Sequence, residues 1–324
     1  MSEHQLLTVR NLVKYHHTPN GRVHAVDRID LDLNQGETLG LVGESGCGKS
    51  TLGRTLIRLH EPDSGEIIHH GTDITHLSRA QMRPFRRNLQ IVFQDPFASL
   101  NPRRTIRQIL SEPFSIHGVG SRSEQPSMVE ALIAKVGLHP SFADRFPHEL
   151  SGGQRQRIAI ARAIALEPST VICDEPVSAL DVSVQAQIIN LLRRLQDDIG
   201  VSYIFISHDL SVIGYLADRI AVMYLGEIVE IAPKAQLWNT PLHPYTQALF
   251  SAIAVPEPPS VARNNRVGIK GDIPSPINPP GGCRFRTRCP VAMPICSEAS
   301  PKLLEAGGGA KVACHLVNGT NTVS

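Results

Sequence analysis

The chain has 324 residues, which exceeds one ordinary domain, and its 41% hydrophobic content is enough for a substantial core. Its 32 basic and 30 acidic residues nearly cancel, so the charge balance gives no global argument for nucleic-acid binding. No uninterrupted apolar run approaches the roughly 18 residues that span a bilayer, and the opening MSEHQ lacks a signal-peptide pattern. We therefore expect a cytosolic chain that reaches a membrane only through partners.

The first informative segment, GESGCGKST at 43–51, matches the pattern G-x-x-x-x-G-K-[ST]. An apolar run at 39–42 predicts a strand before it and residues 50–59 predict a helix after it, which is the context that a phosphate-binding loop requires. Its glycines let successive N–H groups point at phosphate. Lys49 supplies positive charge near the outer phosphates and Ser50 offers a hydroxyl to Mg²⁺. The predicted phosphate-loop residues are Gly43, Glu44, Ser45, Gly46, Cys47, Gly48, Lys49, Ser50 and Thr51.

Two cysteines, one in this loop and one in a later apolar run, differ in their expected chemistry. Cys47 lies close to a helix N-terminus and to Lys49, where a thiolate is favoured, so we expect alkylation to block the site and bound nucleotide to protect it. Cys173 lies in an apolar run and is expected to be a buried strand residue.

Two adjacent carboxylates, Asp174 and Glu175, directly follow the apolar run at 171–173. Strand ends are where such groups meet a ligand. Because the chain turns at Pro176, Asp174 can reach Mg²⁺ while Glu175 addresses a water molecule. Taken alone, the pair is equally typical of a solvated strand end; the phosphate loop favours the functional interpretation.

A third motif, LSGGQ at 150–154, precedes an apolar helical segment. Ser151 is a good N-cap, and the two glycines allow the backbone close to a phosphate. Together the three motifs resemble those of the nucleotide-binding subunits of ATP-binding cassette (ABC) transporters. The resemblance implies a P-loop NTPase (RecA-like) α/β core with an antiparallel β subdomain and a helical insertion. It also implies that two ATP molecules are sandwiched between two cassettes, the signature residues of one facing the γ-phosphate held by the other. These signature residues are Ser151, Gly152, Gly153 and Gln154.

The same resemblance implies roles for further residues. Gln94 matches a glutamine that senses Mg²⁺ and the attacking water, and His208 matches a switch histidine at the γ-phosphate. Asp181 belongs to a loop, 178–181, through which the two nucleotide sites communicate. The adenine-stacking aromatic of the family falls at His16 by register, with Tyr15 one place before it; either ring has the flat face required.

We predict three regions. The nucleotide-binding α/β core comprises residues 1–94 and 166–240, and the helical signature subdomain 95–165 interrupts it. The start of this insertion, 95–103, is a proline-bounded turn region suited to docking another protein. The resemblance implies that this protein is a membrane subunit, because the equivalent segment of the family receives the coupling helix of the membrane subunits. Residues 241–324 form a C-terminal extension, and prolines crowd its stretch 256–280, so regular secondary structure is not expected there.

Segments of this extension, at 243–246, 271–276, 281–283 and 288–290, resemble the C-terminal extension of dipeptide and oligopeptide importer ATPases. The resemblance implies an ATPase at the cytoplasmic face of the inner membrane that powers peptide uptake. Its implied partners are two membrane-spanning permease subunits, a second, paralogous ATPase subunit and, indirectly, a solute-binding protein, with no nucleic acid. Nickel and glutathione importers share the extension and remain alternatives. A soluble ABC ATPase without membrane partners and a non-catalytic metal-sensing module are the other classes.

Four of the six cysteines lie in the extension, at Cys283, Cys289, Cys296 and Cys314. A disulfide framework is disfavoured in a cytosolic protein, whereas four thiolates can hold zinc or an iron–sulfur cluster. The spacing lacks the close C-x2-C pairs usual for zinc, and Pro290 follows Cys289 as in one ferredoxin ligand run. Members of the resembling subfamily carry a comparable set with a [4Fe–4S] cluster. We therefore expect a [4Fe–4S] cluster, then zinc, then free thiols.

Overall fold

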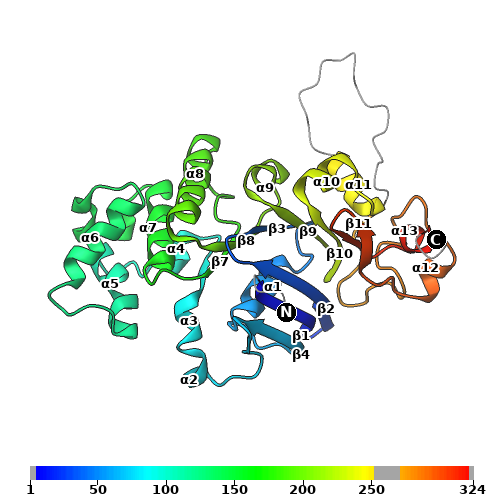
Figure 1. Cartoon of the computed structure of the whole chain (residues 1–324), viewed down its shortest axis with the longest axis horizontal. Helices are drawn as coiled ribbons and strands as arrows, with labels where there is room; N and C mark the ends of the chain where they lie inside the picture. The colour runs from blue at the N-terminus through cyan, green and yellow to red at the C-terminus, as the bar shows by residue number, and fades with distance from the viewer. Residues whose placement is uncertain (1–4, 252–270, 321–324) are drawn as a thin grey trace, which may run out of the picture. The chain divides into compact units, whose positions relative to one another are not determined.

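The computed structural model describes residues 5–251 and 271–320 (Figure 1). Its contacts divide the chain into two compact units. Unit 1 contains Leu33–Glu37 and His76–Ile206, and unit 2 contains Leu6–Asp32, Thr38–Thr75 and the described residues from Ser207 onward.

Unit 1 contains a small parallel sheet in which β7 (Thr170–Asp174) lies between β6 (Leu89–Val92) and β8 (Ser202–Ile206). All five residues of β7 are buried, as are all five of β8, which explains why both strands are continuous apolar runs in the sequence. The helical elements of this unit are α2 (Arg79–Met82), α3 (Phe85–Asn88), α4 (Pro96–Ser99), α5 (Ile106–His117), α6 (Gln125–Lys135), η1 (Pro140–Asp144), η2 (Pro147–Glu149), α7 (Gly152–Ile164) and α8 (Val182–Ile199).

The helices α5, α6 and α7 gather at one end of unit 1 (Figure 1). Their sequences set their ends: Thr105 caps α5 through a capping box, and Gly118 in the left-handed conformation ends it. The apolar residues of α7, which include Ile158, Ile160 and Ile164, are buried around most of the helix. The signature motif is thereby placed at the start of a firmly packed helix.

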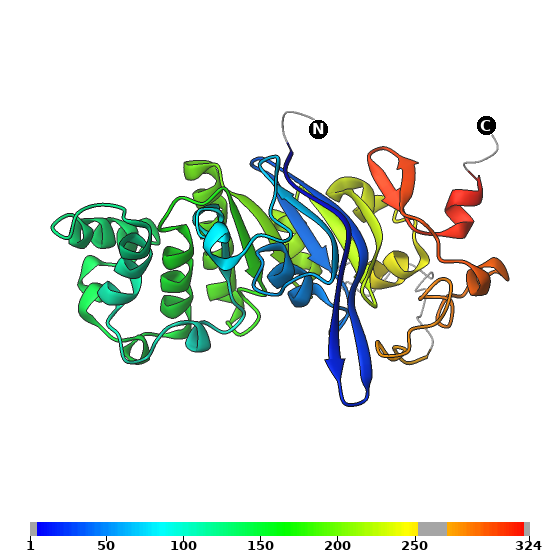
Figure 2. The same ribbon diagram turned by 90° about the horizontal axis from the view of Figure 1, so that it is seen from below.

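Unit 2 contains an antiparallel sheet in the order β2 (Gly21–Asn34), β1 (Gln5–Thr18), β4 (Ser64–His69) and β5 (Thr72–Asp73). The strands β1 and β2 run side by side as a long ribbon (Figure 2). A second set of strands has the order β11 (Leu304–Gly307), β12 (Ala310–Val312), β10 (Glu227–Pro233), β9 (Arg219–Tyr224) and β3 (Thr38–Val42), with β3 and β9 parallel. The helices of unit 2 are α1 (Lys49–Leu56), α9 (Leu210–Leu216), α10 (Lys234–Asn239), α11 (Pro244–Ser251), α12 (Ile295–Glu298) and α13 (His315–Thr320).

The C-terminal extension is irregular only in part. Residues 271–294 carry no helix or strand, whereas Pro256, Pro258 and Pro259 lie outside the described residues. Beyond them, β11 and β12 form a hairpin that the sequence analysis did not predict, with Glu230 of β10 opposite Val312 of β12. An open edge of β10 offers backbone groups that a later segment can pair with, and short local patterns do not reveal such pairing. Over the described part of the chain, the helices fall short of the length and apolarity that crossing a bilayer requires.

Candidate nucleotide-binding site

The predicted phosphate loop connects β3 to α1, and its glycines have backbone angles that other residues rarely adopt. The φ angles are 153° at Gly43, 79° at Gly46 and 109° at Gly48. A Cβ atom at Gly48 would lie 1.8 Å from the carbonyl oxygen of Ala25, and one at Gly43 would lie 2.1 Å from that of Met223. Only glycine fits at these two positions, so the loop can keep the tight path that directs N–H groups at an anion.

Lys49 lies within this loop. Its ammonium donates hydrogen bonds to the carbonyl oxygens of Gly43 and Glu44, at 2.8 and 3.0 Å, and the residue is only 5% exposed. The two loop carbonyls hold the side-chain nitrogen at the loop itself. This placement is what a phosphate-binding lysine requires.

Cys47 is not the activated thiol that the sequence analysis expected. The side chain is buried, with 5% exposure, and burial raises the pKa of its thiol although the Lys49 charge acts in the opposite direction. The expectation of a favoured thiolate was wrong because spacing along the chain shows the nearby charge but not the loss of hydration. Cys173 is fully buried in β7, as expected.

The two candidate adenine-stacking rings on β1 face different neighbours. The His16 ring nitrogen Nε2 lies 3.4 Å from the Thr51 hydroxyl, in the first turn of α1. The Tyr15 hydroxyl instead donates to the Asp27 carboxylate at 2.9 Å, and the Arg22 guanidinium lies 4.7 Å from the centre of its ring. This divergence follows from strand alternation. His16 is therefore the ring that lies beside the phosphate loop.

The carboxylate pair lies at the end of β7 in unit 1. Asp174 is 1% exposed, and Glu175 follows in a left-handed conformation with φ 48°. The Gln94 side-chain amide donates a hydrogen bond to the Glu175 carboxylate at 3.0 Å. Two residues that are 81 positions apart, and that were both predicted to address the attacking water, thus lie in direct contact.

The signature motif begins α7 as expected. The Ser151 hydroxyl accepts a hydrogen bond from the Gln154 N–H at 3.3 Å, and the Gln154 side chain accepts one from the Ser151 N–H at 2.9 Å. A Cβ atom at Gly153 would lie 2.5 Å from a methyl of Val184, so glycine permits α7 to pack closely on α8. Ser151 is exposed, which leaves the positive end of the helix dipole open to solvent.

Asp181 also caps a helix, and His208 lies just before another helix cap. The Asp181 carboxylate caps α8 by accepting from the Val184 N–H at 2.9 Å and from the Ser183 hydroxyl at 2.6 Å. These hydrogen bonds, that of Ser183 first, lower its pKa. His208 is exposed in unit 2, directly before Asp209, the N-cap of α9.

Comparison with known proteins identifies the family to which these motifs belong. Residues 26–178 match the family described as ABC transporter, and residues 229–296 match the oligopeptide/dipeptide transporter C-terminal region. The oligopeptide transport ATP-binding protein AppF of Bacillus subtilis is 57% identical over 297 residues, which cover 91% of this chain and 90% of that protein. The chain belongs to the ABC transporter family.

Solved structures agree with this assignment. The dimeric ATP-binding cassette MJ0796, in a post-hydrolysis state bound to ADP and Pi, is 28% identical with a TM-score of 0.65 and covers 70% of this chain and 98% of its own. The cbiO1 protein from Clostridium perfringens, part of the transporter complex cbiONQ, has the same identity and TM-score and covers 74% of this chain and 92% of its own. The expected P-loop NTPase fold is confirmed, and this ABC protein is an ATP-hydrolysing cassette.

The four cysteines of the extension line one hollow in the cassette's C-terminal region. Burial raises the pKa of Cys283 to about 11 and also raises those of Cys289 and Cys314. In the described part of the chain, however, no three histidine, cysteine or carboxylate side chains are arranged to ligate a metal ion. Cysteine side chains are suitable ligands for a metal ion or cluster. The four cysteines, as the described residues place them, are not arranged to ligate one.

Sequence reasoning missed the residues of the extension that contact the phosphate loop. The Glu44 N–H donates to the Tyr245 hydroxyl at 3.0 Å, and the Glu44 carboxylate accepts from Arg288 at 2.8 and 3.1 Å. These partners are separated by 201 and 244 positions, and no local pattern in this cassette connects them.

Proposed function

We propose that this ABC protein is the ATP-hydrolysing subunit of an importer for dipeptides or oligopeptides. The observation that carries the proposal is the match of residues 229–296 to the oligopeptide/dipeptide transporter C-terminal region in the same chain as the cassette. The name of AppF, an oligopeptide transport ATP-binding protein similar over 91% of this chain, supports it.

In this proposal the chain works at the cytoplasmic face of the inner membrane with two permease subunits, a second, paralogous cassette and, indirectly, a solute-binding protein. The predicted docking segment supports the permease contact, because α4 leaves the ring of Phe97 55% exposed. The Arg155 guanidinium lies 3.8 Å from the centre of this ring. Aromatic and arginine side chains are both enriched in protein–protein interfaces.

The chemistry would proceed on the residues already placed. The phosphate loop and Lys49 bind the phosphates of ATP, and Glu175 accepts a proton from the attacking water while Gln94 holds the carboxylate in position. Ser50, Gln94 and Asp174 are the proposed Mg²⁺ ligands; the ion neutralises charge on the phosphates when bound.

The site would be completed by a second cassette. The exposed N-terminus of α7, with Ser151, Gly152 and Gly153, presents the positive end of its dipole to the γ-phosphate held opposite. His208 is proposed to contact the same phosphate, Asp181 to link the two nucleotide sites, and His16, in preference to Tyr15, to stack on adenine.

Reconstitution with the neighbouring membrane and solute-binding subunits tests this function. Dipeptides or oligopeptides should stimulate ATP hydrolysis, and the Glu175→Gln variant should abolish the stimulated rate. Stimulation by nickel complexes or glutathione alone would replace the peptide assignment. Full activity without membrane subunits would favour a soluble ABC ATPase.

We propose further that Cys283, Cys289, Cys296 and Cys314 hold a [4Fe–4S] cluster in preference to zinc. Their shared hollow supports a thiolate-bound group. The spacing without close C-x2-C pairs, with Pro290 directly after Cys289, favours the cluster over zinc. Four iron and four sulfide per chain, with a broad visible absorption after anaerobic purification, are the expected result. Stoichiometric zinc without iron would reject the cluster, and the absence of both would leave free thiols.

A further inference from the structure

The phosphate loop of this protein contains a carboxylate that its ligand should repel. Glu44 is the second residue of the loop, and ATP is strongly anionic, so an uncompensated charge at this position opposes binding. The structure shows how the charge is compensated. Both guanidinium NH₂ groups of Arg288 donate to the two carboxylate oxygens of Glu44, at 2.8 and 3.1 Å.

This ion pair is more protected than an ordinary surface pair. The Arg288 side chain is 8% exposed and that of Glu44 is 23% exposed, so water screens the pair only in part. A bidentate geometry fixes direction as well as distance. The Tyr245 hydroxyl accepts from the Glu44 N–H at 3.0 Å, so the extension holds both the side chain and the backbone of this residue.

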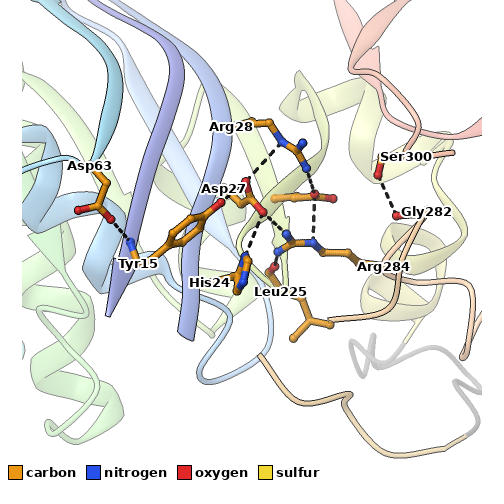
Figure 3. Close-up of polar contacts among 10 residues, drawn as sticks. Tyr15, His24, Asp27, Arg28, Asp63, Leu225, Gly282, Arg284 and Ser300 are labelled. Carbon is orange, nitrogen blue, oxygen red and sulfur yellow. Dashed lines mark hydrogen bonds and ion pairs between the residues drawn. The ribbon is translucent and has the colours of Figure 1, made fainter. Parts of the chain in front are cut away.

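A second arginine secures the same extension against neighbours of the loop. The Arg284 guanidinium donates to the Asp27 carboxylate on β2 and to the carbonyl of Leu225, in the turn between β9 and β10 (Figure 3). In that turn the Gly226 N–H donates to the Cys47 carbonyl of the phosphate loop at 2.9 Å. The extension therefore contacts the loop directly, through Arg288 and Tyr245, and indirectly through this turn.

We propose that Arg288 is a positioning residue for ATP binding, acting through Glu44. It neutralises the loop carboxylate and fixes the loop's first turn, so the affinity of the cassette for ATP depends on its C-terminal extension. Arg288 lies outside the phosphate-loop, carboxylate-pair and signature motifs. Its role rests on nucleotide binding by the loop and does not depend on the transported solute.

The test is the dissociation constant of a fluorescent trinitrophenyl-ATP, and of ATP by competition, measured with the purified full chain. Arg288→Ala leaves the charge of Glu44 uncompensated and should weaken ATP binding about tenfold or more, the size expected for repulsion between like charges in a partly desolvated site. Adding Glu44→Gln to this variant removes the repelling charge and should restore the affinity to within about threefold of the original. Arg288→Lys, which keeps the charge but loses the bidentate geometry, should lie between.

Lys311→Ala is the matched control, because Lys311 is a cation of the same extension whose ion pair with Glu305 is exposed. It should leave nucleotide affinity unchanged. The proposal is overturned if Arg288→Ala melts normally and binds ATP as the original chain does, or if the double variant binds as weakly as Arg288→Ala. Should Arg288→Ala fail to fold, Arg288→Lys with and without Glu44→Gln provides the same comparison.

Discussion

At the scale of single residues, the phosphate loop depends on glycines for two separable reasons. Gly46 has a positive φ, but no atom of the described residues would lie within 4 Å of a Cβ added there, so alanine meets only conformational strain. At Gly48 an added methyl would also collide with the Ala25 carbonyl at 1.8 Å. The two positions thus separate backbone strain from the close approach that shapes the site.

Gly48→Ala should abolish detectable ATP binding, since the loop must move to admit the methyl group. Gly46→Ala should lose about 1–2 kcal/mol of stability and retain weakened binding, because an L residue in the left-handed region costs roughly that amount. Nucleotide titration and thermal unfolding of both variants measure the difference. Equal affinities in the two variants would show that the collision at Gly48 does not shape the site.

Glu175→Gln should retain ATP binding and lose at least about a hundredfold in hydrolysis, because a general base contributes roughly 10²–10⁴-fold. The substitution also removes the carboxylate that accepts a hydrogen bond from the Gln94 side-chain amide. Phosphate release at saturating ATP measures the rate, and size-exclusion chromatography with ATP should show an accumulated closed dimer. Asp198→Asn, an exposed acid on α8, is the control and should hydrolyse normally. Near-normal turnover by Glu175→Gln would contradict its assigned role.

At the scale of elements, two helices of unit 1 begin with the same type of capping box, but only one of them has a proposed role in ATP hydrolysis. Ser151 caps α7 and Thr105 caps α5, each with a glutamine three residues later. Ser151→Ala and Thr105→Ala should therefore each lose about 1 kcal/mol of stability. Only Ser151→Ala should reduce hydrolysis in the assembled transporter. An equal loss of activity in both variants would mean that the signature serine acts only as a cap.

The sequence predicted some helices and strands and missed others. The strands β3 and β7 and the helix α7 were predictable, because an apolar run and a cap residue are local features. The hairpin of β11 and β12 was not, since it is stabilised by the edge of β10, which lies far earlier in the chain. For a related reason the sequence mispredicted the chemistry of Cys47 and did not reveal the ion pair of Glu44 and Arg288. Burial and pairing between distant residues are properties of the folded chain.

At the scale of the whole molecule, the predicted machinery is divided between the two units. Unit 2 carries the phosphate loop and His208, and unit 1 carries Gln94, the carboxylate pair and the signature helix. Unit 2 also contains two histidines whose pKa values are strongly lowered, His69 on β4 and His243 before α11. The free energy of unfolding of the full chain at acid pH should therefore depend on these two histidines of unit 2.

Both histidines are buried and stay neutral in the folded protein. Burial lowers the pKa of His69 to about 4, with a contribution from His70, and lowers that of His243 to about 3. The His243 ring accepts a hydrogen bond from the Tyr245 N–H at 3.0 Å, which also requires an unprotonated Nδ1. In the unfolded chain the pKa of a histidine is about 6.5. Between this pH and the lowered pKa of the folded protein, only the unfolded state binds the proton.

The stability that these two neutral rings contribute is consequently present above about pH 6.5 and is lost as the pH falls toward about 4. Each should remove up to about 1.4 kcal/mol per pH unit in that window. Unfolding temperatures of the full chain between about pH 7.5 and 4.5 measure this loss, and His69→Gln or His243→Gln should each flatten the dependence. His76→Gln, at an exposed histidine, should leave it unchanged. If the buried variants keep the original slope, other groups govern the acid sensitivity of this fold.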